Sequence, residues 1–549
     1  MTNSAVAALG HEIWTWREAT AFRTSDDIPR IDHDPGWLPG ITTASVDARR
    51  ARLAELRDAW AALDIGGLEV ADRVDHRLLG SALARVTWEL DVVRAWERDA
   101  VFAAGQALGP YYDLLLPVPP LGSGHQAGLI AALQAVPAQL AVAREHLSRA
   151  GWAPLARAAV ELLAGIEETL NASVAVAASL VDVDQRDALQ GAGRDAAAAL
   201  DDYAAWLART APEMADPEPV GRAAFVWFLR HVALLPSEPE ALVAAAEHEY
   251  HRAVVGEALA RNRHRDQPLP QLPESVEAQV ALHAQGEEQI RQFYETHDLL
   301  SQPASLRRYL TAPLPDYLDG LEWLGVSDDL TGPARLDIDG VSYTPRPGPE
   351  LPYFYKANAR DPRLGIIHEG AHYKQLALSW THERLVRRHY YDSVANEGIA
   401  FYNEEMMLQA GLFADAPRSV EVVYNFMRLR ALRVITDVSL ATGAFDLEAA
   451  VATFVERVPM DRDTAFTESA FYLATPGQAM TYLVGKLELQ RLAADAITTQ
   501  GASFSLRAFH DYVWRNGNVP FSLQRWELLG DRSDVDVLDA ADTTTPPAM

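Results

Sequence analysis

The residues whose types and spacing could perform chemistry are His368, Glu369 and His372, which form a His-Glu-x-x-His sequence. In a helix, positions four apart lie on one face, so both imidazoles can reach a single metal ion. Glu369 lies beside this pair, where its carboxylate can take a proton from a water molecule. The pattern predicts a zinc hydrolase, although the same pentapeptide also occurs by chance on ordinary amphipathic helices.

The sequence around the pentapeptide favours the metal interpretation. Asp361 and Pro362 are typical of a helix start, an N-cap acid followed by proline at the first helical position. Ile367, Leu376 and Trp380 continue an apolar stripe, which predicts that this helix is buried. Buried polar groups need partners, and a metal ion would supply them.

The third ligand is expected from the next helix, at Glu397, 25 residues after His372. Ser393 can cap this helix and Gly411 can end it. Two helices joined by a short connection would pack antiparallel and bring Glu397 over the histidines. Two histidines and one glutamate leave the fourth tetrahedral position for water, as catalytic zinc requires. The alternative for Glu397 is a solvated acid in the first helical turn.

Other charged residues near these helices are expected to be structural. Glu404 and Glu405 lie two turns after Glu397; Glu404 could support a metal ligand by a hydrogen bond, but a solvated face is preferred for both. Asp437 could brace a ligand histidine, but a pair with Arg433, one turn earlier, is preferred.

Three segments resemble one known family. Residues 397–404, Glu-Gly-Ile-Ala-Phe-Tyr-Asn-Glu, resemble the Glu-Gly-Trp-Ala-x-Tyr-x-Glu signature of the domain-of-unknown-function 885 family. Residues 475–486 resemble its Pro-Gly-Gln-Ala-x-x-Tyr-x-x-Gly-Lys stretch, and residues 509–520 resemble its closing motif. The resemblance is clear over roughly the C-terminal 200 residues. It implies a mainly α, two-lobed helical fold like that of zinc peptidases, with a central cleft.

The chain departs from the family pattern at two places. Family members usually carry His-Glu-x-x-Pro-Gly-His-His-x-Gln, whereas residues 368–375 are two residues shorter and restore the plain His-Glu-x-x-His spacing. The family also has Asp-x-Gly-x-His where this chain reads Asp437-Val-Ser-Leu-Ala441. A histidine that could contact substrate is therefore replaced by Ala441, which admits a specialised substrate.

The family-like stretch supplies candidates for the remaining catalytic roles. Tyr482 is the first choice as the donor to an oxyanion, and Tyr472 is the second; a structural hydrogen bond is the alternative for each. Lys486 is a further candidate, because lysine is rare in this chain and the family motif also places one there.

Composition and net charge limit the classes of partner that the protein can bind. The net charge of −28 disfavours nucleic acid and anionic membrane as partners. The absence of cysteine excludes disulfides, thiol catalysis and cysteine-ligated zinc. A basic N-terminal region followed by an apolar run is not evident, nor is an 18-residue apolar stretch, which predicts a cytoplasmic protein. The oligomeric state cannot be predicted from the chain.

Hydrophobic periodicity organises the chain into two halves and a tail. Residues 1–262 are helical in pattern and are expected to form one wall of the cleft, while residues 263–530 form the zinc-binding half. Residues 531–549 are acidic and are expected to be a disordered tail. A small β-hairpin near the site is predicted from two alternating runs, 334–339 and 341–344, on either side of Gly340.

These observations leave three functions open. The first is a zinc peptidase of carboxypeptidase or oligopeptidase type that uses a metal-activated water. The second is a zinc enzyme for a small non-peptide amide, ester or biosynthetic intermediate, which Ala441 makes credible. The third is an inert binding protein, against which the retained base Glu369 argues.

Overall fold

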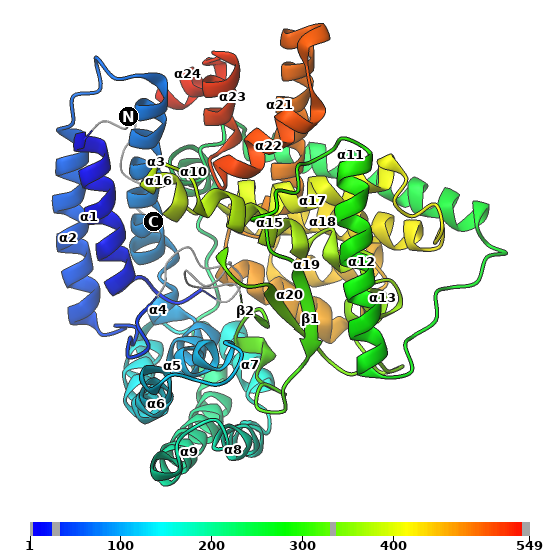
Figure 1. Ribbon diagram of the computed structural model, residues 1–549. Coiled ribbons are helices and arrows are strands. Elements are labelled where there is room, and N and C mark those ends of the chain that lie inside the picture. Colours follow the sequence, from blue (N-terminus) through cyan, green and yellow to red (C-terminus); the bar gives the residue numbers. More distant parts are fainter. Residues whose placement is uncertain (1–3, 25–32, 330–335, 541–549) are drawn as a thin grey trace.

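The computed structural model describes residues 4–24, 33–329 and 336–540, and most of this chain is helical (Figure 1). The first part contains α1 (Ser4–Thr20), α2 (Thr43–Ala61), α3 (Val70–Thr87), α4 (Ala95–Arg98), α5 (Ala100–Leu115), α6 (Ser123–Ala150), α7 (Ala153–Leu162), α8 (Ile166–Ala177), α9 (Arg186–Thr210), α10 (Arg222–Trp227) and α11 (Pro239–Arg263). Two π-helical turns, Trp88–Val93 and Phe228–Val232, follow α3 and α10.

The second part carries the motifs. Its helices are α12 (Val276–Thr296), α13 (Tyr353–Arg360), α14 (Arg363–Ile366), α15 (Glu369–Trp380), α16 (Leu385–His389), α17 (Ser393–Ala410), α18 (Ser419–Thr442), α19 (Leu447–Arg457), α20 (Arg462–Ala474), α21 (Thr481–Gln500), α22 (Leu506–Asn516), α23 (Phe521–Leu529) and α24 (Ser533–Asp539). Figure 1 places α15, α17 and α18 in the middle of the view, among helices that are distant in sequence.

The small sheet differs from the predicted hairpin. Its three strands are β1 (Tyr309–Pro313), β2 (Asp328–Asp329) and β3 (Gly340–Thr344), in the order β1-β3-β2. β3 pairs parallel with β1 and antiparallel with β2. The second predicted run is therefore a strand, but residues 336–339 of the first run form a turn, and residues 334 and 335 lie outside the described residues. The partners of β3 come from segments earlier in the chain, which local alternation cannot reveal.

Three large hydrophobic cores hold the helices together, and they do not divide at residue 262. One core joins Phe225 and Ala246 to residues of α17, α18 and α21. A second joins α5, α6, α8 and α9 to residues 317–324. The third joins α1–α3 to Val519 and Trp526 near the end of the chain. Each core thus combines segments from both predicted halves.

The expected disordered tail is wrong over its first part. Residues 533–539 form α24, which buries Val535 and Leu538 against the core of α1–α3. These two apolar residues lie three apart, on one helical face, which explains how an acidic segment is held in place. Residues 541–549 lie outside the described residues.

One helix is long and apolar enough to cross a membrane by length and composition alone, namely α6. This finding corrects the expectation that no such stretch exists. In the structure, α6 packs against α5 and α9 and buries Leu129, Leu133 and Val136. Core helices of soluble proteins pass the same test, so this helix is weak evidence for a membrane span.

Candidate metal centre

The His-Glu-x-x-His pentapeptide, residues 368–372, lies across a break between two helices instead of within one helix. α14 ends at Ile366 and α15 begins at Glu369, so His368 occupies the N-cap position of α15. Asn403 of α17 donates from Nδ2 to the carbonyl oxygen of Ile367 at 2.6 Å, and Tyr294 donates to Asn403 Oδ1 at 2.8 Å. These buried hydrogen bonds satisfy the carbonyl group of Ile367 at the break. They also fix the backbone position from which the His368 side chain projects.

The structure brings together the three predicted metal ligands. Oε2 of Glu397 lies 3.3 Å from Nε2 of His368 and 3.3 Å from Nε2 of His372. These three residues are buried, with 8% or less of each residue exposed. Ligand atoms of His368, Glu369 and His372 also lie within 4.8 Å of one another. The predicted base is thus beside the predicted ligands.

The donor atoms of this cluster fit a divalent cation. Within the described part of the chain, Oε2 of Glu397 and Nδ1 of His372 are buried and have no hydrogen-bond partner of good geometry. A buried carboxylate oxygen without a donor is costly, and a metal ion between it and two imidazole nitrogens would remove that cost. Nitrogen and oxygen donors from two histidines and one glutamate are a common catalytic zinc set.

Glu404 is buried beneath His368, which makes the prediction of a solvated face wrong for this residue. Oε1 of Glu404 lies 2.7 Å from Nδ1 of His368, on the side of the ring opposite Nε2. Arg430 of α18 lies 2.8 Å from the same carboxylate, which is 1% exposed. Such a carboxylate fixes the tautomer and orientation of a metal-binding histidine. The glutamate is in the sequence signature, but its arginine partner comes from another helix.

We predict that Glu404→Gln weakens zinc binding by roughly 10–100-fold, because the amide holds the His368 ring less firmly and adds no negative charge. Competition with a fluorescent zinc chelator measures this affinity. Glu405→Gln is a poor control because Glu405 is itself buried in an ion pair, so the exposed Glu383→Gln serves instead. Equal zinc affinity in wild type and Glu404→Gln would contradict this role.

The charges of the metal-free cluster depend on one another. Burial lowers the pKa of His368, but hydrogen bonding to Glu397 and Glu404 outweighs burial and raises this pKa to about 9. Burial raises the pKa of Glu397, yet His372 and His368 hold it well below its usual range. In the metal-free protein, His368 is therefore charged at neutral pH.

This coupling predicts how the stability of the metal-free protein changes with pH. The folded pKa of His368 lies above its unfolded value of 6.5, so its contribution is complete below pH 6.5 and disappears as pH rises through about 9. Thermal unfolding of chelator-treated protein should show a falling midpoint over this window, and His368→Gln should flatten it. Zinc-loaded protein should lack this slope, because a ligand imidazole carries no proton at the metal-binding nitrogen. A slope that is identical in His368→Gln would contradict the assignment.

Two glycines bring α17 and α21 into close contact. A Cβ atom on Gly398 would lie 2.5 Å from the backbone of Gly485, and one on Gly485 would lie 1.9 Å from the carbonyl oxygen of Val394. Neither position therefore has room for a side chain. The crossing sets Glu397, next to Gly398, against the helix that carries Tyr482. It also explains in physical terms why both motifs contain glycine.

The caps of α17 follow the prediction only in part. Gly411 ends the helix with a φ of 95°, as expected. The N-cap is Asp392 and not Ser393, because the Asp392 carboxylate accepts from the backbone N–H of Ala395. The Ser393 hydroxyl lies 3.1 Å from that of Thr481, at the start of α21.

Tyr482 lies beside the metal cluster. Its ring stacks on that of His368, with centroids 6.0 Å apart and planes at 13°. The guanidinium groups of Arg430 and Arg433 lie 5.4 Å and 5.2 Å from the centre of the Tyr482 ring. The predicted first choice for an oxyanion donor is therefore next to a predicted ligand, and two cations flank it.

Lys486 is placed differently from its predicted catalytic role. Its ammonium group is fully buried and donates to Glu249 at 2.7 Å and to Glu405 at 2.8 Å. It also lies 4.9 Å from the ring centre of Phe401. These contacts tie α21 to α11 and α17, so the position of Lys486 supports a structural role. Glu405, expected on a solvated face, is part of this buried ion pair.

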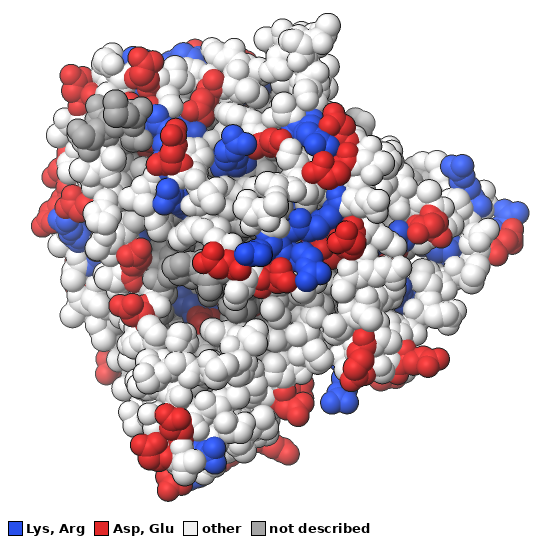
Figure 2. Space-filling view, viewed as in Figure 1, with Lys and Arg blue, Asp and Glu red and all other residues white. Residues whose placement is uncertain are grey.

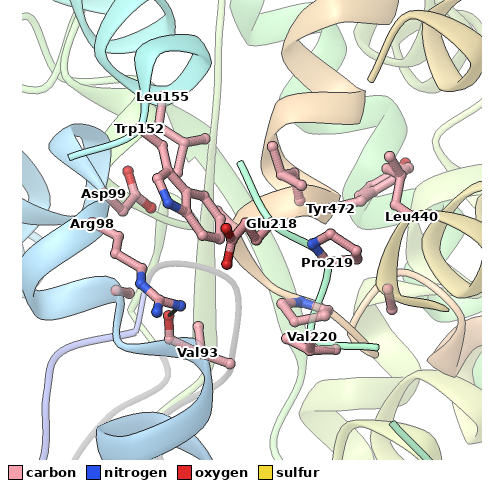
Figure 3. Close-up of a pocket in the computed structure, with 15 residues that line it drawn as sticks. Val93, Arg98, Asp99, Trp152, Leu155, Glu218, Pro219, Val220, Leu440 and Tyr472 are labelled. Atoms are coloured by element: carbon pink, nitrogen blue, oxygen red, sulfur yellow. Dashed lines mark hydrogen bonds between the residues drawn. The ribbon is translucent and has the colours of Figure 1, made fainter. Parts of the chain in front are cut away.

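Tyr472, the second choice for an oxyanion donor, lines a small pocket, where Figure 3 labels it. Ala441 lines the same pocket. Its hydroxyl donates to Glu468, and burial raises its pKa well above the usual value. In the same view Arg98 and Asp99 lie on the opposite side of the pocket. The pocket encloses only about 20 Å³, room for about one water molecule, so it is too small for a substrate.

Asp437 takes neither of the two roles considered for it. Its carboxylate accepts from the backbone N–H groups of Gly477 and Met480, both at 2.9 Å. Burial raises the pKa of Asp437 to about 7, against these hydrogen bonds, which lower it. The residue thus holds the turn that precedes α21, while Arg433 contacts Glu468 instead.

A cavity of about 790 Å³ reaches the N-terminal ends of α17 and α21. Its wall includes Ser393 and Val394 from α17, Thr481 from α21, and Asp328 from β2. Asp328 accepts a hydrogen bond from Tyr309 at 3.2 Å, and a Cβ atom on Gly370 would lie 3.6 Å from the Tyr309 ring, so one end of the cavity is close to the pentapeptide. Cavities of this size hold small ligands or short peptides.

On the face in Figure 2, basic side chains gather near the centre among acidic ones, so the net charge is not spread evenly.

The fold and the site define a mainly helical protein with a buried cluster of two histidines and a glutamate. The chain belongs to the family described as "Bacterial protein of unknown function (DUF885)", whose sequence profile matches residues 29–301 and 357–527. This family assignment confirms the resemblance seen in the C-terminal motifs and extends it to the N-terminal helices.

Solved structures share the fold. One is a candidate lipoprotein from Colwellia psychrerythraea, with a TM-score of 0.73 and 15% identity, over 98% of this chain and 100% of that one. Another is a candidate lipoprotein of unknown function from Shewanella oneidensis, with a TM-score of 0.68 and 16% identity, over 96% and 99% of the two chains. No curated protein sequence matches the chain.

Proposed function

We propose that this protein is a zinc-dependent hydrolase, namely a peptidase of carboxypeptidase or oligopeptidase type. The observation that carries the proposal is the buried Oε2 atom of Glu397, which lies 3.3 Å from Nε2 of both His368 and His372. Two imidazole nitrogens and one carboxylate oxygen thus converge on one point, which is the donor set of a common catalytic zinc site.

His368, His372 and Glu397 would hold the metal, and zinc bound there supplies a Lewis acid that lowers the pKa of water. Glu369 is half-buried and beside the ligands, so its carboxylate takes the proton from the attacking water and passes it to the leaving amine. Tyr482, whose ring lies between the guanidinium groups of Arg430 and Arg433, would donate from its hydroxyl to the negative charge that develops on the carbonyl oxygen.

The cavity of about 790 Å³ is the proposed substrate cleft, enclosed between the N-terminal helices and the helices of the metal centre. Its wall combines aromatic side chains such as Trp14 and Trp88 with polar groups such as Ser393 and Gln478. A mixed lining of this kind suits a peptide, which carries both apolar side chains and backbone amides.

The replacement of the family histidine by Ala441 favours a second candidate, a zinc enzyme that acts on a small non-peptide amide or ester. In this chain Ala441 lines the small pocket with Tyr472, so that position offers no polar group to a substrate. The metal centre and the base would be the same in both candidates.

Incubation of zinc-loaded protein with a mixed peptide library, analysed by mass spectrometry, tests the proposal. Cleavage that is abolished by a chelator and restored by zinc supports the peptidase. Bound zinc without any peptide cleavage would favour the second candidate, and the absence of both zinc and cleavage would contradict both.

A further inference from the structure

The arginine side chains in the wall of the large cavity are already paired with carboxylates. Among the described residues of this wall, each of the three arginines forms an ion pair with an acidic residue of the same wall, in the pairs Arg17–Glu89, Arg23–Asp113 and Arg85–Asp392. The nitrogen–oxygen distances in these pairs are 3.2, 2.7 and 3.2 Å. The described wall contains no lysine, and Asp34 and Asp328 add two further acidic side chains. Its cationic side chains are therefore neutralised within the wall itself.

The two helix N-termini that reach the cavity are neutralised in the same way. Asp392 is the N-cap of α17, and its carboxylate accepts from the backbone N–H of Ala395 at 3.3 Å. The Asp437 carboxylate accepts from the backbone N–H groups of Gly477 and Met480, just before α21. Both acids are buried. A helix N-terminus attracts anions, but here the protein offsets the partial positive charge of each one with its own carboxylate.

A carboxylate from a ligand has two ways to approach these arginines, and both are unfavourable. If it displaces the resident acid, one ion pair only replaces another; at Arg85 this would leave the Asp392 side chain, which is 1% exposed, without its arginine. If it binds beside the resident acid, two negative charges share one guanidinium group, and like charges repel. The arginines of the wall therefore give a ligand carboxylate no net attraction.

The rest of the wall is rich in aromatic side chains. They come from segments that are far apart in the sequence, namely Trp14, Phe22, Trp37, Trp88, Phe102, Phe228, Tyr391 and Phe471. Several of these rings contact one another: the centroids of Phe22 and Phe102 are 5.2 Å apart, and those of Trp88 and Phe228 are 4.8 Å apart. Aromatic walls bind apolar side chains, which need no opposite charge. The wall therefore suits an uncharged segment of peptide with large apolar side chains.

We infer that the cavity binds an uncharged, apolar segment of a peptide and rejects a free C-terminal carboxylate. The inference rests on the proposed function, since it names the substrate class of that same site. A carboxypeptidase has to hold the terminal carboxylate of its substrate, and arginine is the side chain best suited to that task. Among the described residues of the wall, every arginine already holds a carboxylate of the protein. The cavity therefore favours the oligopeptidase type over the carboxypeptidase type.

The experiment measures binding to the full chain in the presence of a chelator, so that it can fail separately from the proposed function. Without metal, a probe carboxylate cannot bind zinc and no peptide is cleaved. Isothermal titration calorimetry compares N-acetyl-phenylalanyl-phenylalanine amide, which is uncharged, with the corresponding free acid. Wild type is compared with Glu89→Gln and Asp392→Asn, which remove the carboxylate partners of Arg17 and Arg85. Asparagine is also a good N-cap, so Asp392→Asn should keep α17 intact.

Asp202→Asn is the matched control. It removes a carboxylate that lies 2.7 Å from a guanidinium nitrogen of Arg144, and neither residue lines the cavity. This variant therefore loses the same charge and also breaks an ion pair of arginine, but away from the proposed binding site.

Wild type and Asp202→Asn should bind the amide at least about tenfold more tightly than the free acid. Glu89→Gln and Asp392→Asn should bind the acid at least about tenfold more tightly than wild type does, because each offers it a guanidinium group, while their affinity for the amide stays the same. Wild type that binds the acid as tightly as the amide, or that binds neither probe, would overturn the inference. An unchanged affinity for the acid in both folded variants would overturn it as well. Zinc content and peptide cleavage, measured on zinc-loaded protein, decide the proposed function independently.

Discussion

Glu369→Gln is expected to lower the rate of hydrolysis by roughly 10²–10⁴-fold while the protein keeps its zinc. The amide has the size of the carboxylate but cannot accept a proton from water at neutral pH. Since the metal ligands in this proposal are His368, His372 and Glu397, the substitution should leave metal content unchanged. Turnover of a substrate identified from the peptide library, together with metal analysis of the same sample, measures both effects.

The control for this substitution is Glu383→Gln, which removes an exposed glutamate shortly after α15 and should behave like wild type. A Glu369→Gln variant that stays active would contradict the assigned base. A variant that loses both zinc and activity would place Glu369 among the ligands instead.

Gly485→Ala is expected to destabilise the fold by about 3 kcal/mol or more. The added methyl group would lie 1.9 Å from the carbonyl oxygen of Val394 and 2.6 Å from the Cα atom of Gly398. Both are backbone atoms of α17, so the two helices would have to separate. Because Glu397 lies at this crossing, zinc affinity should fall together with the thermal unfolding midpoint.

Gly105→Ala is the matched control for this substitution. Gly105 is also inside a helix, α5, but a Cβ atom there would have no neighbour within 4 Å. Alanine has a higher helix propensity than glycine by roughly 1 kcal/mol, so this variant should be at least as stable as wild type. Equal midpoints for Gly485→Ala and wild type would show that the helix crossing can relax.

Local sequence patterns predicted the elements of the metal centre but not their surroundings. The spacing of His368 and His372, and the helix that carries Glu397, were sufficient to predict that these three residues meet. The break at His368 was missed because it depends on Asn403, which contacts the Ile367 carbonyl only after α17 has packed. Glu404 was misjudged for the same reason, since its partner Arg430 lies on α18.

Long apolar patterns also concealed breaks in the N-terminal helices. The apolar periodicity of residues 75–100 predicts a single helix, but a π-helical turn and Arg94, with a φ of 55°, interrupt it. Lys486 illustrates a further limit. Its rarity and its place in a motif indicated importance, but only packing reveals that its partners are Glu249 and Glu405. A buried ion pair of this kind can be as specific a requirement as a catalytic group.

The central claim is that His368, His372 and Glu397 hold zinc, and metal analysis of the purified protein tests it most directly. Inductively coupled plasma mass spectrometry should find about one zinc ion per chain in wild type and in Glu369→Gln. His372→Ala and Glu397→Ala should contain almost none, while circular dichroism shows that they remain helical. Wild-type protein that takes up no zinc, or ligand variants that retain it fully, would contradict the account.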